Sequence, residues 1–350
     1  MQRVNVRSVR FWLLSGLIFG ANLLGVRAEA ADKPVSLRIG TLAPRGTTYH
    51  KHLLAMGEQW RTGSGGAVRL VIFPDGTQGS EADMVGLMQT GNLDAGLLTA
   101  VGLSEIEPAV TALQSMPMSF RSLDEVDYVG EKLRPKLEER LHSKGYTVLF
   151  WTDSGWVRFF TKTPILHPDD LRQLKIFTWV GNVHEYDLWK SSGFKPVALE
   201  TAGIPQALLS DTVQAISMPP FFALAGQLHV QVKYMLELNW APLVGAAVVK
   251  TKSWERVPAH AREAMLKTAH EIGKQVKAAG RAESESAVAA MVSKHGLKVQ
   301  KVSPQVEGEW RAILEKLQDQ IRGKIVPADV FDESQRLLKE YRASAGGKPK

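Results

Sequence analysis

The residues best suited to catalysis or metal binding do not form a recognisable site. The chain has nine histidines and no cysteine. His50 and His52 would place two metal ligands on one face of a strand, but residues 47–63 have helical spacing, in which i and i+2 diverge. Asp169 and Asp170 are better explained as a helix start than as an acid/base pair. With no H-E-x-x-H, G-x-S-x-G, G-x-G-x-x-G or P-loop motif, we predict no enzyme activity, metal or cofactor.

The N-terminus has the pattern of a secretory signal peptide. Arginines precede an apolar run over residues 11–26, and small residues at 28–30 supply an A-x-A cleavage site. The run is shorter than the roughly 20 residues of a membrane span, although a retained membrane anchor is the alternative. No cysteine follows the run, which excludes a lipoprotein anchor. We predict a signal peptide over residues 1–30 and a periplasmic mature protein that does not span a membrane.

Charge and size narrow the class further. The full chain carries a net charge of +7, and removal of four arginines and one glutamate with the signal peptide leaves +4. Apart from Lys348 and Lys350 at the end, no basic block is present, so nucleic-acid binding is not expected. An exported chain without disulfides needs a large core, and about 320 mature residues usually fold as two lobes.

The elements that must position a site alternate between strand and helix. In the first part of the chain, hydrophobic spacing predicts strands over 35–40, 67–73 and 95–99, with a helix over 47–63. A further helix begins after Ser80, which can cap it together with the aspartate three residues later. This β-α-β-α-β order predicts an open α/β sheet.

A second α/β unit follows, and a long helix comes after it. Strands are predicted over 147–152, 174–180 and 213–217, and residues 243–251 form a strand that crosses back to the first lobe. Residues 258–294 contain alanines and paired charges with few helix breakers, which predicts one long helix.

Several short motifs resemble one known family when they are taken in order. Residues 73–81 read F-P-D-G-T-Q-G-S-E, similar to a family turn F-P-x-G-x-L-G-x-E with glutamine in place of leucine. Residues 89–94, 158–161, 169–177 and 208–215 follow further family segments in the same order. The chain thus resembles the extracytoplasmic solute receptors of TRAP-type transporters, the DctP-like family, over nearly all of its mature length.

The resemblance implies a fold and a working cycle. The expected fold is α/β and periplasmic binding protein-like, with two α/β lobes, a hinge of crossing strands and a long C-terminal helix. Lobe I would comprise 31–153 plus 243–282, and lobe II 154–242 plus 283–342 with the C-terminal helices, before a disordered tail over 343–350. A ligand would close the lobes. The receptor would then deliver it to inner-membrane transporter subunits or to a helical-repeat periplasmic partner.

The same resemblance marks positions that would meet a ligand. The family's principal carboxylate-binding arginine matches Phe177, which offers neither a charge nor a donor fork. A second family arginine is kept as Arg158, and a family asparagine before a proline matches Met218. Two of the three polar positions are therefore lost, which puts an ordinary organic acid in doubt.

The predicted ligand site combines a few polar groups with many apolar ones. The polar candidates are Arg158, Thr48, Tyr49 and Thr99. The apolar candidates on segments that flank the expected cleft are Trp156, Phe177, Trp179, Met218, Phe221 and Trp240. Burying about 200 Å² of apolar ligand surface supplies roughly 5 kcal/mol. We therefore predict a hydrophobic or amphipathic, lipid-like ligand such as a sterol or hopanoid.

Alternatives stay open at this stage. Arg158 alone could hold a small organic acid, or it could form an ion pair in the hinge with no ligand role. Phe221 could serve lobe packing as well as ligand contact. In a different class, the protein would be an interaction protein without a small ligand.

Overall fold

The computed structural model describes residues 33–344. The predicted signal peptide and residues 345–350 of the predicted tail lie outside the described residues. The last helix continues to Ala343, so the first residue of the predicted tail is helical. Between residues 33 and 344, none of the helices has the length and apolar character that a membrane span requires.

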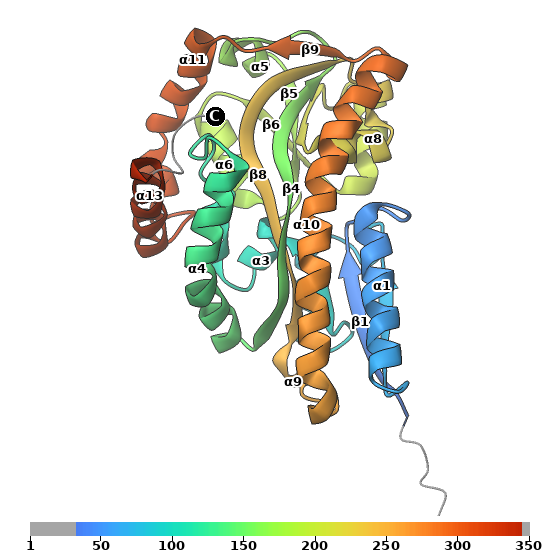
Figure 1. Ribbon diagram of the computed structural model, residues 1–350. Helices are drawn as coiled ribbons and strands as arrows, with labels where there is room; N and C mark the ends of the chain where they lie inside the picture. The colour runs from blue at the N-terminus through green and yellow to red at the C-terminus, as the bar shows by residue number, and fades with distance from the viewer. Residues whose placement is uncertain (1–32, 345–350) are drawn as a thin grey trace, which may run out of the picture. The chain divides into compact units, whose positions relative to one another are not determined.

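The described residues form one mixed sheet of nine strands covered by helices (Figure 1). The strands are β1 (Val35–Thr41), β2 (Val68–Phe73), β3 (Ala95–Thr99), β4 (Tyr146–Thr161), β5 (Lys175–Trp179), β6 (Lys195–Leu199), β7 (Ala215–Met218), β8 (Tyr234–Lys250) and β9 (Lys298–Lys301). Their order is β2-β1-β3-β8-β4-β7-β5-β6, and β9 pairs with β8. The predicted α/β sheet is thus present.

Helices and 3-10 turns connect the strands. They are α1 (Thr48–Gly63), α2 (Glu81–Gln89), α3 (Ala100–Ser104), η1 (Pro108–Leu113), α4 (Leu123–Ser143), α5 (Pro168–Arg172), α6 (Val183–Ser191), η2 (Thr201–Gly203), α7 (Ile204–Leu209), α8 (Pro220–Ala225), η3 (Leu228–Val230), α9 (Thr251–Trp254), α10 (Ala259–His295), α11 (Pro304–Glu315), α12 (Gln318–Ile321) and α13 (Ala328–Ala343). The predicted cap of α2 is confirmed, because the Asp83 N–H donates to Ser80 Oγ at 3.2 Å and the Ser80 N–H donates to Asp83 Oδ2 at 2.9 Å.

Two long antiparallel strands, β4 and β8, join the halves of the sheet (Figure 1). β3 pairs with the end of β8, whereas β7 pairs with the end of β4. Both strands extend well beyond the predicted 147–152 and 243–251. Gly245 allows close packing at the crossing, since a Cβ there would lie 2.3 Å from the Leu98 carbonyl oxygen. This arrangement is the predicted hinge of crossing strands, while the residue boundaries of the lobes stay a prediction.

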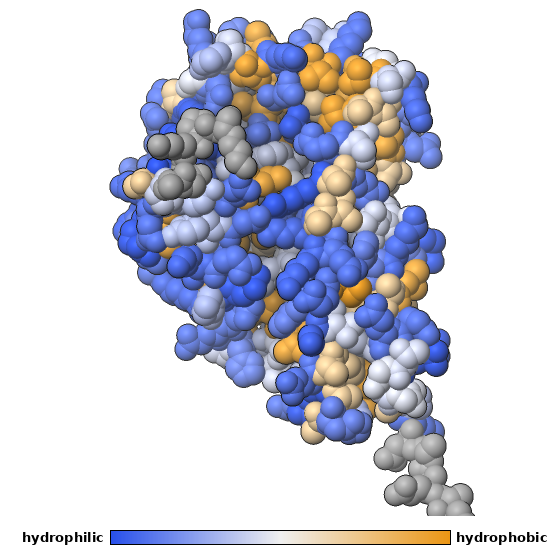
Figure 2. All heavy atoms as spheres, in the orientation of Figure 1, coloured by the Kyte–Doolittle hydropathy of each residue, from blue (hydrophilic) through white to orange (hydrophobic). Residues whose placement is uncertain are grey.

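The long predicted helix is confirmed as α10, which has 37 residues. It packs against β4, α1 and α8, and a buried row that includes Met265, Ile272 and Val276 makes the contact. Gly273 permits the close approach, because a Cβ there would lie 2.4 Å from Phe150 Cβ. The helix ends at His295 and is followed by Gly296, whose φ of 69° suits glycine. Figure 2 shows hydrophilic residues over the middle of the face along which α10 runs, with hydrophobic patches towards both ends.

Candidate functional site

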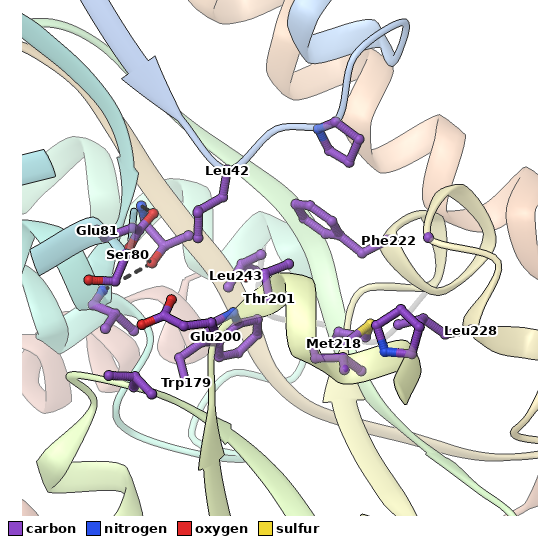
Figure 3. Close-up of a pocket in the computed structure, with 17 residues that line it drawn as sticks. Leu42, Ser80, Glu81, Trp179, Glu200, Thr201, Met218, Phe222, Leu228 and Leu243 are labelled. Atoms are coloured by element: carbon purple, nitrogen blue, oxygen red, sulfur yellow. Dashed lines mark hydrogen bonds between the residues drawn. The ribbon is translucent and has the colours of Figure 1, made fainter. Parts of the chain in front are cut away.

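A cavity of about 110 Å³ lies where the ends of β1, β3, β5 and β7 approach one another (Figure 3). Its walls come from both halves of the sheet, because residues near β1 and α2 face residues near α7 and α8. Most of the wall is apolar and includes Leu42, Trp179, Met218, Phe222, Leu228 and Leu243. Its polar residues are Ser80, Glu81, Thr99, Glu200 and Thr201.

The ionisable groups in this wall are acidic. Glu81 is buried, and its oxygens accept hydrogen bonds from the Thr99 N–H at 2.7 Å, Thr99 Oγ1 at 2.6 Å and the Gly102 N–H at 2.9 Å. Burial nevertheless raises the pKa of Glu81. Burial, followed by the neighbouring Asp83 carboxylate, raises the pKa of Glu200. No lysine, arginine or histidine is among the described residues that line the cavity, so the wall favours a neutral ligand over an anion.

Three of the predicted site residues line this cavity. They are Thr99 at the end of β3, Trp179 at the end of β5 and Met218 at the end of β7. Thr99 also caps α3 by accepting a hydrogen bond from the Val101 N–H. Met218, where the resemblance implies the loss of a polar residue, therefore lies in the cavity wall; its role in ligand binding stays a prediction.

Phe177 does not lie in the cavity wall, and its predicted role is revised. Its side chain is 0% exposed and belongs to the core. It packs edge-on against Trp179, with ring centroids 4.9 Å apart. Phe177 lies two residues before the end of β5, so Trp179 reaches the cavity and Phe177 supports it from the core.

Arg158 is likewise absent from the lining residues. Its guanidinium nitrogens lie 3.8 Å from a Glu237 oxygen and 3.9 Å from a Glu285 oxygen, and only 10% of its side chain is exposed. These contacts join β4 to β8 and to α10. They agree with the alternative of an ion pair in the hinge, and they do not place a cation at the cavity.

Tyr49 and Phe221 form a contact beside the main cavity. Their rings stack with centroids 5.5 Å apart, and Tyr49 Oη donates to the Asp153 carbonyl at 2.8 Å. Burial raises the pKa of Tyr49, which keeps its hydroxyl neutral. Tyr49 lines a smaller adjoining cavity of about 40 Å³, whereas Phe221 is buried and its neighbour Phe222 meets the main cavity.

The remaining predicted residues lie elsewhere. Thr48 is the first residue of α1, and its carbonyl lies 2.8 Å from His52 Nδ1. Trp156 is 7% exposed within a hydrophobic cluster and lines none of the cavities described here. Trp240 lines a third cavity of about 50 Å³. The sequence prediction therefore combined residues from one cavity, its neighbours and the core.

Some lining residues were not predicted. Glu81 ends the F-P-D-G-T-Q-G-S-E motif, so its position was visible in the sequence although its role was not. Leu228 and Glu200 lie outside any motif, and only the folded chain brings them to the cavity.

The two histidines of the possible metal site use their rings locally. Both lie in α1, as predicted, where His50 Nδ1 accepts from the Gly46 N–H at 3.2 Å. Across residues 33–344, no group of three or more histidines, cysteines, aspartates or glutamates is arranged to hold a metal ion.

Comparison with known proteins gives the family. Residues 39–324 match the family described as bacterial extracellular solute-binding protein, family 7. The chain belongs to this family. The predicted relationship to the TRAP-type, DctP-like receptors is therefore confirmed, and so is the general function of a solute-binding receptor.

Relatives and solved structures agree with this assignment. The chain is 21% identical to the C4-dicarboxylate-binding periplasmic protein DctP of Rhodobacter capsulatus, over 89% of this chain and 94% of that protein. It is 24% identical to the 2,3-diketo-L-gulonate-binding periplasmic protein YiaO of Escherichia coli, over 77% of this chain and 80% of that protein.

The fold matches solved TRAP periplasmic solute-binding proteins. One from Sulfurospirillum deleyianum, with bound succinate, gives a TM-score of 0.79 at 17% identity, covering 87% of this chain and all of that one. DctP7 of Bordetella pertussis, which binds pyroglutamic acid, gives a TM-score of 0.78 at 19% identity, covering 87% of this chain and 99% of that one. The predicted periplasmic binding protein-like fold with two lobes is thereby confirmed.

Proposed function

We propose that this protein is a periplasmic receptor that captures a neutral, largely apolar or amphipathic solute and delivers it to a membrane transport partner. The observation that carries the proposal is the wall of the main cavity. It is mostly apolar, its ionisable groups are Glu81 and Glu200, and the described lining residues include no cation.

The energetic comparison favours a neutral ligand. A carboxylate moved from water into such a cavity loses several kcal/mol of hydration, and the ionisable lining residues Glu81 and Glu200 supply no positive charge to offset this loss. Burying about 100 Å² of apolar ligand surface contributes about 2.5 kcal/mol. Transfer from water into the cavity is therefore favourable in free energy for a neutral apolar group and unfavourable for a carboxylate.

The cavity volume narrows the predicted ligand. Ligand sites commonly enclose about 300–1,000 Å³, whereas the main cavity has about 110 Å³. A sterol or hopanoid exceeds this volume and would need the cavity to widen. We therefore propose a compact apolar body in place of the bulky lipid that the sequence suggested.

A small organic acid is the second candidate. It is favoured by the relatives and solved structures, whose names include dicarboxylate, succinate and pyroglutamic acid. Against it stands the cavity lining, whose described residues include neither Arg158 nor any other cation.

Three probes separate the two candidates: an alcohol, the carboxylate of the same chain length and a dicarboxylate. Thermal unfolding of the purified protein would be followed with 1-octanol, sodium octanoate and succinate. We expect 1-octanol to raise the unfolding temperature and both anions to have no effect at equal concentration. Mass spectrometry of molecules extracted from the purified protein should recover a neutral apolar compound.

A variant reverses the preference. Met218→Arg places a cation in the cavity wall, so octanoate should bind at least about tenfold more tightly than to the wild type. Leu209→Arg, at a side chain that is 61% exposed, is the matched control and should change neither probe. Stabilisation of the wild type by succinate or octanoate, but not by octanol, would contradict the proposal.

A further inference from the structure

The third cavity differs in chemistry from the main one. It has about 50 Å³ and shares Trp179 and Leu243 with the main cavity, so the two cavities adjoin at these residues. Polar side chains make up much of its wall, including Ser115, Glu185 and Ser217. An apolar space thus adjoins a small polar one.

A buried donor without a partner lines this polar cavity. Trp189 is 4% exposed, and its ring is stacked on Trp240 with centroids 5.2 Å apart. Within the described part of the chain, its Nε1–H has no hydrogen-bond partner. An unsatisfied buried donor destabilises a protein by about 1–3 kcal/mol. An acceptor atom of a bound molecule would relieve this penalty.

Two further polar side chains that can accept hydrogen bonds, Glu185 and Ser217, also line this cavity. Glu185, four residues before Trp189 on α6, accepts a hydrogen bond at Oε2 from Asn182 Nδ2 at 2.6 Å. Burial raises the pKa of the Glu185 carboxyl to about 7; the Trp189 N–H lies close enough to this carboxyl to lower the pKa in part, although the two groups do not reach hydrogen-bond geometry. Near neutral pH the group can therefore donate or accept a proton in a hydrogen bond. Ser217, 2% exposed, adds a hydroxyl that can also do either.

We propose that the third cavity is a head-group subsite for a hydroxyl or a similar neutral group that both donates and accepts hydrogen bonds. The apolar body of the same ligand would lie in the main cavity, which adjoins the third cavity at Trp179 and Leu243. This inference rests on the proposed function and specifies its ligand as a compact neutral amphiphile. The small volume admits a hydroxyl-sized group and not a bulky charged one.

The test compares 1-octanol with 1-methoxyheptane, an ether of the same size and shape that cannot donate. Affinities would be measured by calorimetry with the wild type, Trp189→Phe and Ser217→Ala. We expect the alcohol to bind about tenfold more tightly than the ether to the wild type. Each variant should weaken alcohol binding about fivefold and leave ether binding unchanged.

Matched controls separate the subsite from general damage. Ser293→Ala changes an exposed serine on α10, and Trp310→Phe removes a buried indole N–H that donates to the Leu166 carbonyl. Both should preserve the tenfold preference. Equal binding of the two probes, or a preference that survives in both subsite variants, would overturn this inference alone and assign the cavity to water. Failure of both probes to bind would overturn the proposed function as well.

Discussion

Replacing Glu185 by glutamine should stabilise the protein, and the effect should depend on pH. Burial raises the pKa of this carboxyl from 4.5 to about 7. A raised carboxyl pKa means that the folded state resists ionisation, so stability falls as pH rises from 4.5 through 7. At about 1.36 kcal/mol per pH unit, the full loss above pH 7 is about 3 kcal/mol. The Glu185→Gln variant does not ionise and should escape this loss.

Urea unfolding at about pH 5 and pH 8.5 measures the effect. We expect Glu185→Gln to match the wild type within about 0.5 kcal/mol near pH 5 and to exceed its free energy of unfolding by about 2–3 kcal/mol near pH 8.5. The glutamine can keep the hydrogen bond from Asn182. Glu263→Gln, at an exposed position on α10, should show no such difference. An equal change at both pH values would refute the assignment of the raised pKa to Glu185.

Two further substitutions test the packing that supports the site. Arg281 donates four hydrogen bonds to Asp153 and Asp127. The Arg281→Met variant should lower the free energy of unfolding by about 3 kcal/mol, because it leaves the buried Asp153 carboxylate poorly paired. As a control, Arg336→Met at an exposed arginine should lower the free energy of unfolding by less than about 1 kcal/mol. Gly273→Ala should destabilise by about 1–3 kcal/mol because the added Cβ would clash with Phe150. Gly308→Ala, which meets no atom within 4 Å in α11, should stabilise by about 0.5–1 kcal/mol. Urea unfolding checks all four, and a loss in Gly308→Ala equal to that in Gly273→Ala would contradict the steric explanation.

Regular elements with one buried side were predictable from the sequence. The spacing of apolar residues located β1, β2, β3 and α10, and Ser80 marked the start of α2. The full lengths of β4 and β8 were not predictable. Both strands are buried over most of their length, so they lack alternation. Their register also shifts at three places, which interrupts any simple period.

The site was only partly predictable. A family position led to Met218, and an aromatic residue on a segment flanking the expected cleft led to Trp179; both line the cavity because the ends of neighbouring strands meet at one edge of a sheet. They could not show that Phe177, two residues earlier, is covered by the core. They also could not show that Arg158 contacts Glu285 on α10, since that contact depends on how a distant helix packs.

The interruption of pairing between β4 and β8 has a mechanical consequence. The ladder skips residues between Asp153 and Trp156, where Gly155 has a φ of 74°. Bending of the sheet at this point would break few main-chain hydrogen bonds, because few are formed there. A change in the angle between the two halves can thus be concentrated in a few residues, while the paired segments on either side stay rigid.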